Sequence, residues 1–255
     1  MAGSAAPFLR FEQIEKRHGL TRAVAGVTLD IPARGFVALV GPSGSGKSTL
    51  LKTVNRLVEP DEGRVLLEGG DVAALPATAL RRAIGYVFQG VGLFPHMDVA
   101  DNIAIGPRIS GSPIGPARIA ELLELVELDP MLAERMPDAL SGGQRQRVGV
   151  ARALAVQPRL LLMDEPFGAL DPVTRAALGA KMRRLHDDLG LTTIMVTHDM
   201  AEALLLADRV LVIDRGRIAA DSTPARLLAG EGGSVAQALV AVPRAQAAAL
   251  RGLTP

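Results

Sequence analysis

Hydrophobic residues recur along the chain in two patterns, which are short uninterrupted runs and longer stretches with helical spacing. Runs of four or five apolar residues are typical of strands that are buried on both faces of a sheet, and they occur here as FVALV (36–40), LLLM (160–163), TIMV (193–196) and VLVI (210–213). Longer stretches predict helices, namely TLLKTVNRLV (49–58), ARIAELLELVEL (117–128) and DPVTRAALGAKMRRLHDDLG (171–190). The alternation of the two patterns predicts an α/β fold with a mostly parallel sheet.

Two parts of the chain depart from this alternation. Residues 8–29 alternate apolar and polar positions around an HGLT break, which predicts a small antiparallel β subdomain. Residues 90–157 have no long β-branched run and contain Pro/Gly-rich breaks, so we expect an inserted α-helical subdomain. The core is therefore expected at about 8–89 and 158–230, which makes one domain of 8–230. The remaining residues 231–255 are expected to form a partly helical tail without a regulatory domain.

The amino-acid composition limits the kinds of protein that this chain can be. The chain has 255 residues, 48% of them hydrophobic, a formal net charge of +1 and no cysteine. This balance predicts a folded globular protein, gives no strong field for nucleic acid, and excludes disulfides and thiol nucleophiles. The N-terminus lacks a leader pattern and the apolar runs are too short to span a bilayer, so we expect a cytoplasmic chain that reaches a membrane only through a partner.

The sequence GPSGSGKS at 41–48 lies directly between a predicted buried strand and a predicted helix. It matches the phosphate-binding pattern G-x-x-x-x-G-K-[ST], in which backbone N–H groups surround phosphates. Lys47 is expected to neutralise the β and γ phosphates, and the Ser48 hydroxyl is expected to ligate Mg²⁺. The alternative is an ordinary glycine-rich turn.

Polar residues follow the predicted strands at one edge of the sheet. Asp164 ends an apolar strand, where a buried carboxylate needs a cation such as Mg²⁺, and Glu165 is placed to polarise a water for attack on the γ phosphorus. The alternative is an acidic turn before Pro166. His198 follows another strand and could hydrogen-bond the γ phosphate, and Gln89 could reach Mg²⁺ or the attacking water.

The sequence LSGGQ at 140–144 predicts a helix start with an additional role. Ser141 and Gln144 fit a capping box, in which each side chain accepts a backbone N–H of the other residue. Gly142 and Gly143 do not fit it, because each glycine costs about 1 kcal/mol against alanine inside a helix. Bare amides at a helix N-terminus favour an anion, so this segment is a second candidate phosphate site.

The chain resembles the ATPase subunit of an ABC transporter, because it carries in order GPSGSGKST, the Gln of YVFQ, LSGGQ, LLLMDEP, FGALD and the His of VTHD. The resemblance runs from about Phe8 to Leu228. More narrowly, NRLVEPDEG, IGYVFQGVGLFPHMDVADNIA, RVGVARALA and MDEPFGALDPVTR look like the importers of osmoprotectants such as glycine betaine, choline and carnitine. The resemblance therefore implies a P-loop NTPase core, ATP hydrolysis and Mg²⁺.

The resemblance also implies roles for named residues. Two copies would form a head-to-tail homodimer, with each ATP between the phosphate loop of one copy and the LSGGQ of the other, and Asp171 would couple the two sites. Residues 90–97 would receive a helix of an integral membrane permease, which an extracytoplasmic solute-binding protein would supply with solute. Glu165 and His198 would be catalytic, and Ser48, Gln89 and Asp164 would hold the metal. ATP would contact His18, Val24, Gly41, Ser43, Gly44, Ser45, Gly46, Lys47, Ser48, Thr49 and Gln89, and in trans Ser141, Gly142, Gly143 and Gln144.

Two departures from the family pattern alter these expectations. His18 stands where the family usually has an aromatic residue that stacks on adenine, so we expect weaker nucleotide affinity. Many osmoprotectant ATPases continue into a regulatory module, and this chain ends soon after the predicted core. Osmotic gating through such a module is therefore not expected.

Three alternatives to osmoprotectant import remain at this stage. The first is an importer ATPase for another small polar solute, such as an amino acid or a sulfonate. The second is a soluble ATPase of the same superfamily that acts on DNA or ribosomes, although neither a long coiled coil nor tandem cassettes are found. The third is a P-loop kinase or GTPase, in which LSGGQ would have no function.

Overall fold

The computed structural model of the protein describes residues 6–90 and 92–251, which divide into two compact units. The first unit covers residues 1–74 and 194–255, and the second covers residues 75–193. The division falls within one strand, β8 (Thr192–Val196), so that strand contributes to both units. The unit boundaries follow packing, and the domain limits expected from the sequence stay a prediction.

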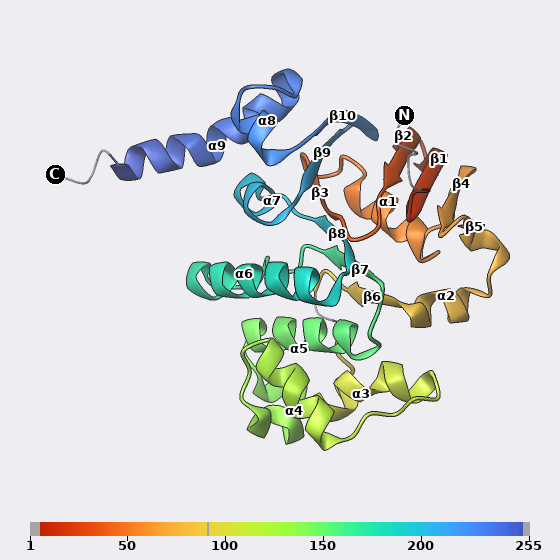
Figure 1. The fold of residues 1–255 in the computed structure, drawn as a ribbon, viewed down its shortest axis with the longest axis vertical. Coiled ribbons are helices and arrows are strands. Elements are labelled where there is room, and N and C mark those ends of the chain that lie inside the picture. Colours follow the sequence, from red (N-terminus) through yellow and green to blue (C-terminus); the bar gives the residue numbers. More distant parts are fainter. Residues whose placement is uncertain (1–5, 91, 252–255) are drawn as a thin grey trace. The chain divides into compact units, whose positions relative to one another are not determined.

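The first unit contains two groups of strands. In one group the order is β2-β1-β4-β5, and β1 and β2 pair antiparallel as the pattern of residues 8–29 predicts. In the other group β9 lies between β10 and β3, and β3 is followed by β8. The bounds of the strands are β1 (Leu9–His18), β2 (Thr21–Ile31), β3 (Phe36–Val40), β4 (Glu62–Leu67), β5 (Gly70–Asp71), β9 (Arg209–Asp214) and β10 (Arg217–Ser222). Figure 1 shows them as the red, orange and blue arrows.

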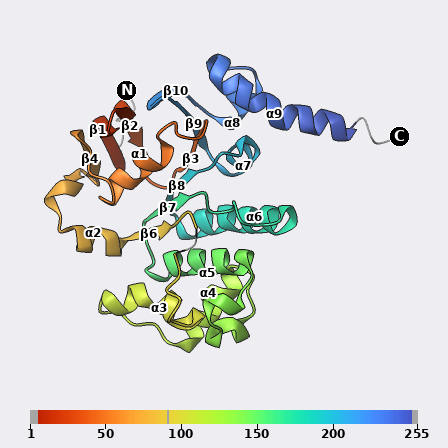
Figure 2. The ribbon, with the colours of Figure 1, turned by 180° about the vertical axis from the view of Figure 1, so that it is seen from behind.

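The helices of the first unit are α1 (Lys47–Val54), α7 (Met200–Leu206), α8 (Pro224–Leu228) and α9 (Gly233–Arg251). The tail is thus helical as far as Arg251, and the last four residues lie outside the described chain. In both views α9 extends away from α8 (Figures 1 and 2), and most of its residues after Val240 are exposed.

Helix α1 is shorter than the sequence pattern predicts. The sequence pattern predicts a helix over 49–58, but the helix ends at Val54, and Leu57 beyond it is 43% exposed. Arg56 adopts a left-handed conformation with φ of 56°, and the N–H groups of Leu57 and Val58 both donate to the carbonyl oxygen of Lys52. This closing geometry ends the helix despite the apolar residues that follow.

The second unit combines two parallel strands with helices. Strand β6 pairs with β7 from Ile84 opposite Leu160 to Val87 opposite Met163, and β7 is followed by the start of β8. Helices α3 and α4 lie against α5 within the residues expected to form a helical subdomain. The bounds are α2 (Ala77–Ala83), β6 (Ile84–Val87), α3 (Val99–Ile109), α4 (Pro116–Leu125), α5 (Gly142–Ala155), β7 (Leu160–Asp164) and α6 (Pro172–Leu189).

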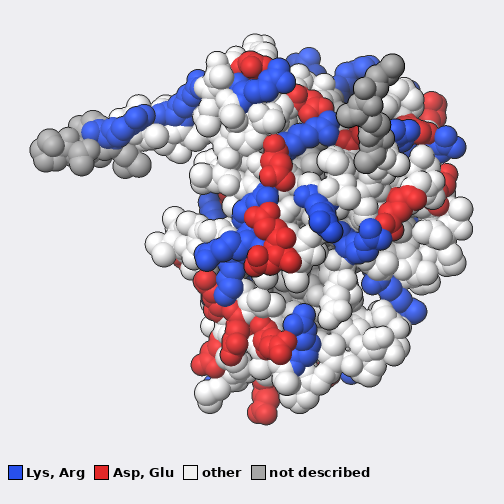
Figure 3. All heavy atoms as spheres, in the orientation of Figure 1, with Lys and Arg blue, Asp and Glu red and all other residues white. Residues whose placement is uncertain are grey.

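The core of each unit follows the predicted apolar runs. Every residue of β3, β7 and β8 is buried, as expected for strands covered on both faces. The described helices include none with the length and apolar character needed to cross a bilayer. On the face shown in Figure 3, basic and acidic side chains are interspersed and do not form a field of one sign.

Candidate functional site

The phosphate loop of the first unit joins β3 to α1, in the strand–loop–helix context predicted from the sequence. Two of its glycines are required by close backbone contacts. A Cβ atom on Gly41 would lie 2.0 Å from the carbonyl oxygen of Ile213, and one on Gly46 would lie 2.0 Å from that of Ala23. Gly44 has open space around it, but its φ of 76° favours glycine.

Lys47 is the first residue of α1, and its ammonium group lies inside this loop. The Nζ atom donates to the carbonyl oxygens of Gly41 at 2.9 Å and Pro42 at 2.8 Å, and it lies 3.4 Å from the Ser45 hydroxyl. The side chains of Lys47 and Ser45 are buried, whereas Ser43 and Gly44 are exposed and Ser48 and Thr49 are partly exposed. A buried ammonium group enclosed by a glycine-rich loop is suited to binding a polyphosphate.

His198 lies in the turn between β8 and α7. It is exposed, and its neighbours hold the turn rigidly, since the Thr197 hydroxyl donates to Glu202 Oε2 at 2.6 Å and accepts from Asp199 N–H at 3.0 Å. Asp199 in turn caps α7 by accepting from Ala201 N–H at 2.7 Å. Thr197 was not predicted as a site residue, and its part in fixing the His198 turn depends on contacts that the sequence pattern does not encode.

The other two predicted nucleotide contacts of the first unit differ in accessibility. His18 is the exposed last residue of β1, directly before the turn at Gly19. Val24 lies in β2 and is only 1% exposed. The structure therefore leaves the imidazole accessible to a base and covers the valine side chain.

Asp164 ends β7 in the second unit and is completely buried, as predicted. Its Oδ2 atom accepts a long hydrogen bond of 3.5 Å from the hydroxyl of Tyr86, which lies in the neighbouring strand β6. Burial, and then the negative charge of Asp164, raise the pKa of Tyr86 above its ordinary value, so the phenol stays protonated and able to donate. Tyr86 is not among the predicted site residues, because a tyrosine in a strand carries no motif.

Glu165 and Gln89 are brought together. The Gln89 amide Nε2 donates to Glu165 Oε2 at 3.3 Å. Glu165 adopts a φ of 50°, a left-handed conformation that is uncommon for a residue with a side chain. Backbone strain of this kind persists where the surroundings hold it, and it is common at functional sites.

The LSGGQ segment starts α5 with the predicted capping box. Ser141 N–H donates to Gln144 Oε1 at 2.8 Å, and Gln144 N–H donates to Ser141 Oγ at 3.2 Å. Arg145 supports the segment from the inside, because its Nη1 donates to the carbonyl oxygen of Leu140 at 2.6 Å. Ser141 is exposed, and Gly142 and Gly143 are partly exposed.

Asp171 is the N-cap of α6. Its Oδ1 accepts from the N–H groups of Val173 at 3.1 Å and Thr174 at 3.0 Å. Hydrogen bonds from Thr174, first from its side chain and then from its backbone, lower the pKa of Asp171 below its ordinary value. Asp171 is exposed and Val173 is 80% exposed, so this helix start presents both side chains to a neighbour.

Val91 of the 90–97 segment lies outside the described residues, and residues 90 and 92–97 form no helix or strand. The rest of it is held by Asn102 of α3, which is completely buried. Asn102 Oδ1 accepts from Phe94 N–H at 2.8 Å, while its Nδ2 lies within 2.9–3.1 Å of the carbonyl oxygens of Phe94, Met97 and Asp98. Asn102, like Tyr86, is not among the residues predicted from the sequence.

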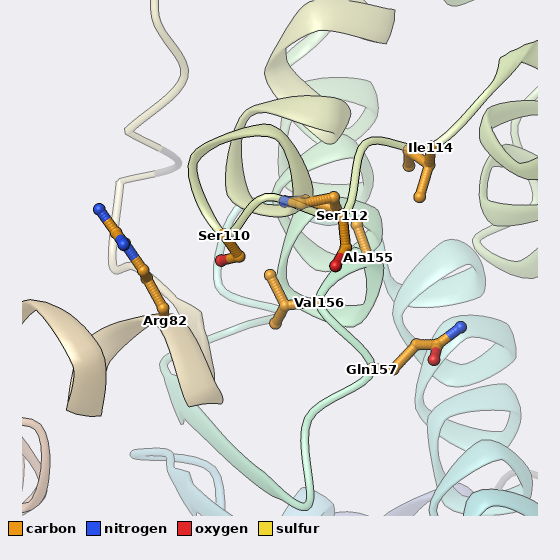
Figure 4. Close-up of a pocket in the computed structure, with 8 residues that line it drawn as sticks. Arg82, Ser110, Ser112, Ile114, Ala155, Val156 and Gln157 are labelled. Atoms are coloured by element: carbon orange, nitrogen blue, oxygen red, sulfur yellow. The ribbon is translucent and has the colours of Figure 1, made fainter.

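A shallow cavity of about 270 Å³ opens at the C-terminal ends of α3 and α5. Figure 4 shows Ser110, Ser112 and Val156 around it, with the head of Arg82 directed away. Its lining residues are Arg82, Pro107, Ser110, Ser112, Ile114, Ala155, Val156 and Gln157, which include none of the predicted site residues.

The predicted site residues divide between the two units. The first unit holds His18, Val24, the phosphate loop and His198, and the second holds Gln89, the LSGGQ segment, Asp164, Glu165 and Asp171. Within the second unit, Gln89 meets Glu165, and the LSGGQ segment lies beside the loop that precedes Asp171, since Gly143 is close to Leu170.

Comparison with known proteins assigns these motifs to one protein family. The sequence profile of the family described as "ABC transporter" matches residues 24–168, which is more than half of the chain. The chain is an ATP-binding cassette of the ABC transporter family. This confirms the resemblance based on the motifs, and it agrees with the P-loop NTPase fold.

Named relatives of this cassette come from several importers. The glycine betaine uptake system ATP-binding protein YehX of Escherichia coli is 49% identical over 86% of this chain and 72% of its own length. The glycine betaine/carnitine/choline transport ATP-binding protein OpuCA of Bacillus subtilis is 46% identical over 86% of this chain and 59% of its own length. The sulfate/thiosulfate import ATP-binding protein CysA of Thermosynechococcus vestitus is 51% identical over 86% of this chain and 65% of its own length. The cassette therefore spans less than two thirds of two of these three relatives.

A solved structure supports the fold assignment. A dimeric ATP-binding cassette in a post-hydrolysis state, bound to ADP and Pi, matches with a TM-score of 0.79 and 32% identity, over 85% of this chain and 98% of that chain. The cassette fold is thus confirmed independently of the sequence motifs.

Proposed function

We propose that this cassette hydrolyses ATP to power solute import through a separate membrane permease. The observation that carries the proposal is the complete set of family motifs in one chain, each in the local structure that its chemistry requires. These include a phosphate loop closed around Lys47, a buried Asp164 at a strand end, and a capped LSGGQ helix with partly exposed glycines. An isolated glycine-rich turn would not explain the other two features.

The donor set fits a magnesium ion. Ser48, Gln89 and Asp164 offer a hydroxyl, an amide carbonyl and a carboxylate, which are the oxygen ligands that a hard cation takes. Asp164 supports this assignment by its position, because its buried carboxylate ends β7 and is held there by the Tyr86 hydroxyl. Bound Mg²⁺ would supply positive charge to the phosphate oxygens of the nucleotide.

The chain's own residues would divide the remaining chemistry. Lys47 and the backbone N–H groups of the 41–48 loop, other than Pro42, would bind and orient the phosphates of ATP, and His18 would lie against the base. Glu165 would accept a proton from the attacking water at its carboxylate, with Gln89 holding that carboxylate through the 3.3 Å contact. His198 would hydrogen-bond the γ phosphate.

Two copies would complete each site in head-to-tail association. Exposure of Ser141, Asp171 and Val173 supports this arrangement, because these residues present a polar and an apolar surface that a second copy could cover. Gly142 and Gly143, with Ser141 and Gln144, would then bind the γ phosphate of ATP held by the partner.

Residues 90–97 would receive a helix of the permease. Phe94 is 42% exposed and Phe88, just before the segment, is 40% exposed, and exposed aromatic side chains are suited to a protein interface. The cassette would then lie on the cytoplasmic face of the membrane through this contact, and an extracytoplasmic solute-binding protein would take part indirectly.

The proposed solute is an osmoprotectant of the glycine betaine, choline or carnitine type. The relatives named for these solutes support it at 46–49% identity. Sulfate or thiosulfate is a second candidate, since the named relative of that importer is 51% identical.

The first experiment tests hydrolysis. Purified Glu165→Gln protein is expected to bind a fluorescent ATP analogue like the parent, to hydrolyse ATP about 100- to 10,000-fold more slowly, and to accumulate as a dimer with ATP. Hydrolysis at the parental rate would remove Glu165 from its proposed role.

The second experiment tests the solute. Cells that lack their own uptake systems are given the cassette with its permease and binding protein, and uptake of labelled glycine betaine, choline, carnitine and sulfate is compared. Uptake of the quaternary amines that depends on Glu165 supports the proposal, whereas uptake of sulfate alone would favour the second candidate.

A further inference from the structure

A chain of side-chain contacts begins at Asp164, the buried carboxylate proposed to hold the metal. The Tyr86 hydroxyl donates to Asp164 Oδ2 at 3.5 Å, and the Tyr86 ring packs edge-on against Phe88, with ring centroids 4.5 Å apart and an interplanar angle of 67°. Tyr86 lies in β6 and Phe88 is the first residue after that strand, and the contact between their rings brings the two side chains together. The phenol therefore cannot shift toward or away from Asp164 without changing its packing on Phe88.

Phe88 in turn contacts the start of the 90–97 segment. The guanidinium carbon of Arg152 lies 5.8 Å from the centroid of the Phe88 ring, within the range of a cation–π contact. A Cβ atom on Gly92 would lie 3.7 Å from Phe88 Cγ, so the backbone of Gly92 lies against the same ring. Arg152 Nη1 also donates to the carbonyl oxygen of Gly92 at 2.7 Å, which ties Gly92 to helix α5.

The series of contacts ends at the turn formed by residues 94–98, which Asn102 holds. Asn102 is completely buried and hydrogen-bonds the backbone of Phe94, Met97 and Asp98. These bonds hold the backbone of residues 94–98 to α3, and their loss inside the protein would be costly. Every one of these residues belongs to the second unit.

We propose that Tyr86, Phe88 and Arg152 are positioning residues that couple the carboxylate of Asp164 to residues 92–97. The inference rests on the proposed function, in which Asp164 belongs to the nucleotide site and residues 90–97 contact the permease. The link is distinct from the Gln89–Glu165 pair, since it starts at the other acidic residue and runs through aromatic packing. A change in the position or charge of the Asp164 carboxylate alters its hydrogen bond with the Tyr86 hydroxyl. The resulting shift of the Tyr86 ring reaches Gly92 through the Phe88 ring and Arg152.

The first experiment needs no nucleotide. The chain has no cysteine, so His96→Cys provides a single exposed thiol for an environment-sensitive fluorophore beside Phe94. The emission of this label is measured in the parent, Tyr86→Phe, Arg152→Met and the double variant. We expect each single change to shift the emission, and the double variant to shift it no more than the larger single change, because both cut one link.

Arg147→Met is the matched control for Arg152→Met. Arg147 also lies on α5 and its Nη1 also donates to a backbone carbonyl, that of Glu127 at 2.7 Å, but it takes no part in the Phe88 contacts. Its effect on the label is expected to be absent or to add to that of Tyr86→Phe. No shift in Tyr86→Phe, or additive shifts for Tyr86→Phe and Arg152→Met, would overturn the proposal.

The second experiment adds Mg-ATP to the labelled proteins, with nucleotide binding followed separately by a fluorescent ATP analogue. We expect a saturable response of the label in the parent, and a response reduced at least about threefold in Tyr86→Phe and in Phe88→Leu with nucleotide affinity retained. An undiminished response in these variants, or no response of the parent despite binding, would contradict the coupling. Failure of the parent to bind nucleotide would refute the proposed function instead, and the nucleotide-free experiment would still decide the link.

Discussion

A Cβ atom placed on Gly143 would lie 3.2 Å from Cδ2 of Leu170, closer than most side-chain contacts in proteins. Gly143 belongs to the LSGGQ segment, and Leu170, which is 5% exposed, directly precedes Asp171. The glycine thus has a packing role in addition to any contact of its amide with phosphate. By contrast, a Cβ on Gly142 would meet nothing closer than Arg145 Nη2 at 4.0 Å.

This difference predicts opposite effects of two alanine substitutions on stability. Gly142→Ala is expected to stabilise the protein by up to about 1 kcal/mol, because alanine is the better helix former. Gly143→Ala should gain the same helix propensity, but crowding of Leu170 should lower the stability of the protein by about 1–3 kcal/mol. Chemical denaturation of both variants measures this, and Gly143→Ala should cost less in a Leu170→Ala background. Equal stability of the two alanine variants would rule out the packing role.

The composite site predicts complementation between two inactive variants. Lys47→Ala removes the buried cation of the phosphate loop, and Ser141→Arg blocks the LSGGQ surface. If each site combines the loop of one copy with the LSGGQ of the other, an equal mixture of the two proteins contains heterodimers with one intact site. We expect each variant alone to be inactive and the mixture to recover up to about a quarter of the parental ATPase rate, since half of randomly formed dimers are mixed.

The control for complementation carries both substitutions in one chain. Mixed with Lys47→Ala protein, the double variant offers no intact loop, so no activity should return. Recovery in this control, or none in the first mixture when mixed dimers are detected, would argue that each chain forms its site alone.

Removal of the Asn102 side chain is expected to destabilise the segment that we propose contacts the permease. Asn102→Ala leaves buried backbone groups of residues 94–98 without their side-chain partner, so unfolding free energy should fall by about 1–3 kcal/mol. Amide hydrogen exchange of residues 92–98 should accelerate more than that of the β7 strand. Asp101→Ala, which alters a half-exposed neighbour paired with Arg108, should change stability by less than about 0.5 kcal/mol.

Titration of Asp171 is expected to contribute to the pH dependence of the protein's stability. Because its pKa is lowered in the folded chain, the stabilisation it contributes is present above the unfolded value near 3.9 and is lost as the pH falls through the folded pKa. Asp171→Asn keeps a good N-cap without this titration. The Tm of the parent minus the Tm of the variant should therefore be constant above about pH 5. It should decrease below about pH 4, because only the parent loses this stabilisation there. A difference that does not change with pH would contradict this.

The sequence predicted those parts of the fold and site that depend on local patterns. The hairpin of β1 and β2, the buried strands, the phosphate loop and the capping box of Ser141 and Gln144 all follow from residues close together in the chain. The position of Asp164 at the end of β7 followed in the same way from an apolar run and the acid after it.

The parts that were missed depend on contacts between distant residues or on a turn that overrides a pattern. Tyr86 and Asp164 are 78 positions apart, and Arg152 and Gly92 are 60 apart, so neither pair leaves a local signal. Leu57 was placed wrongly because its apolar character continues the helical pattern, whereas the left-handed Arg56 ends the helix first. Strand β10 was not predicted, because RIAADS lacks a clear apolar alternation.

The contact between Tyr86 and Asp164 also gives the protein a built-in optical probe. The chain contains one tyrosine and no tryptophan, so its intrinsic near-ultraviolet emission comes from a single phenol ring that lies beside the proposed metal site. Hydrogen bonding and nearby charge alter tyrosine emission, and no extrinsic dye or substitution is needed to observe it. The unmodified cassette therefore reports optically on the state of its own buried carboxylate.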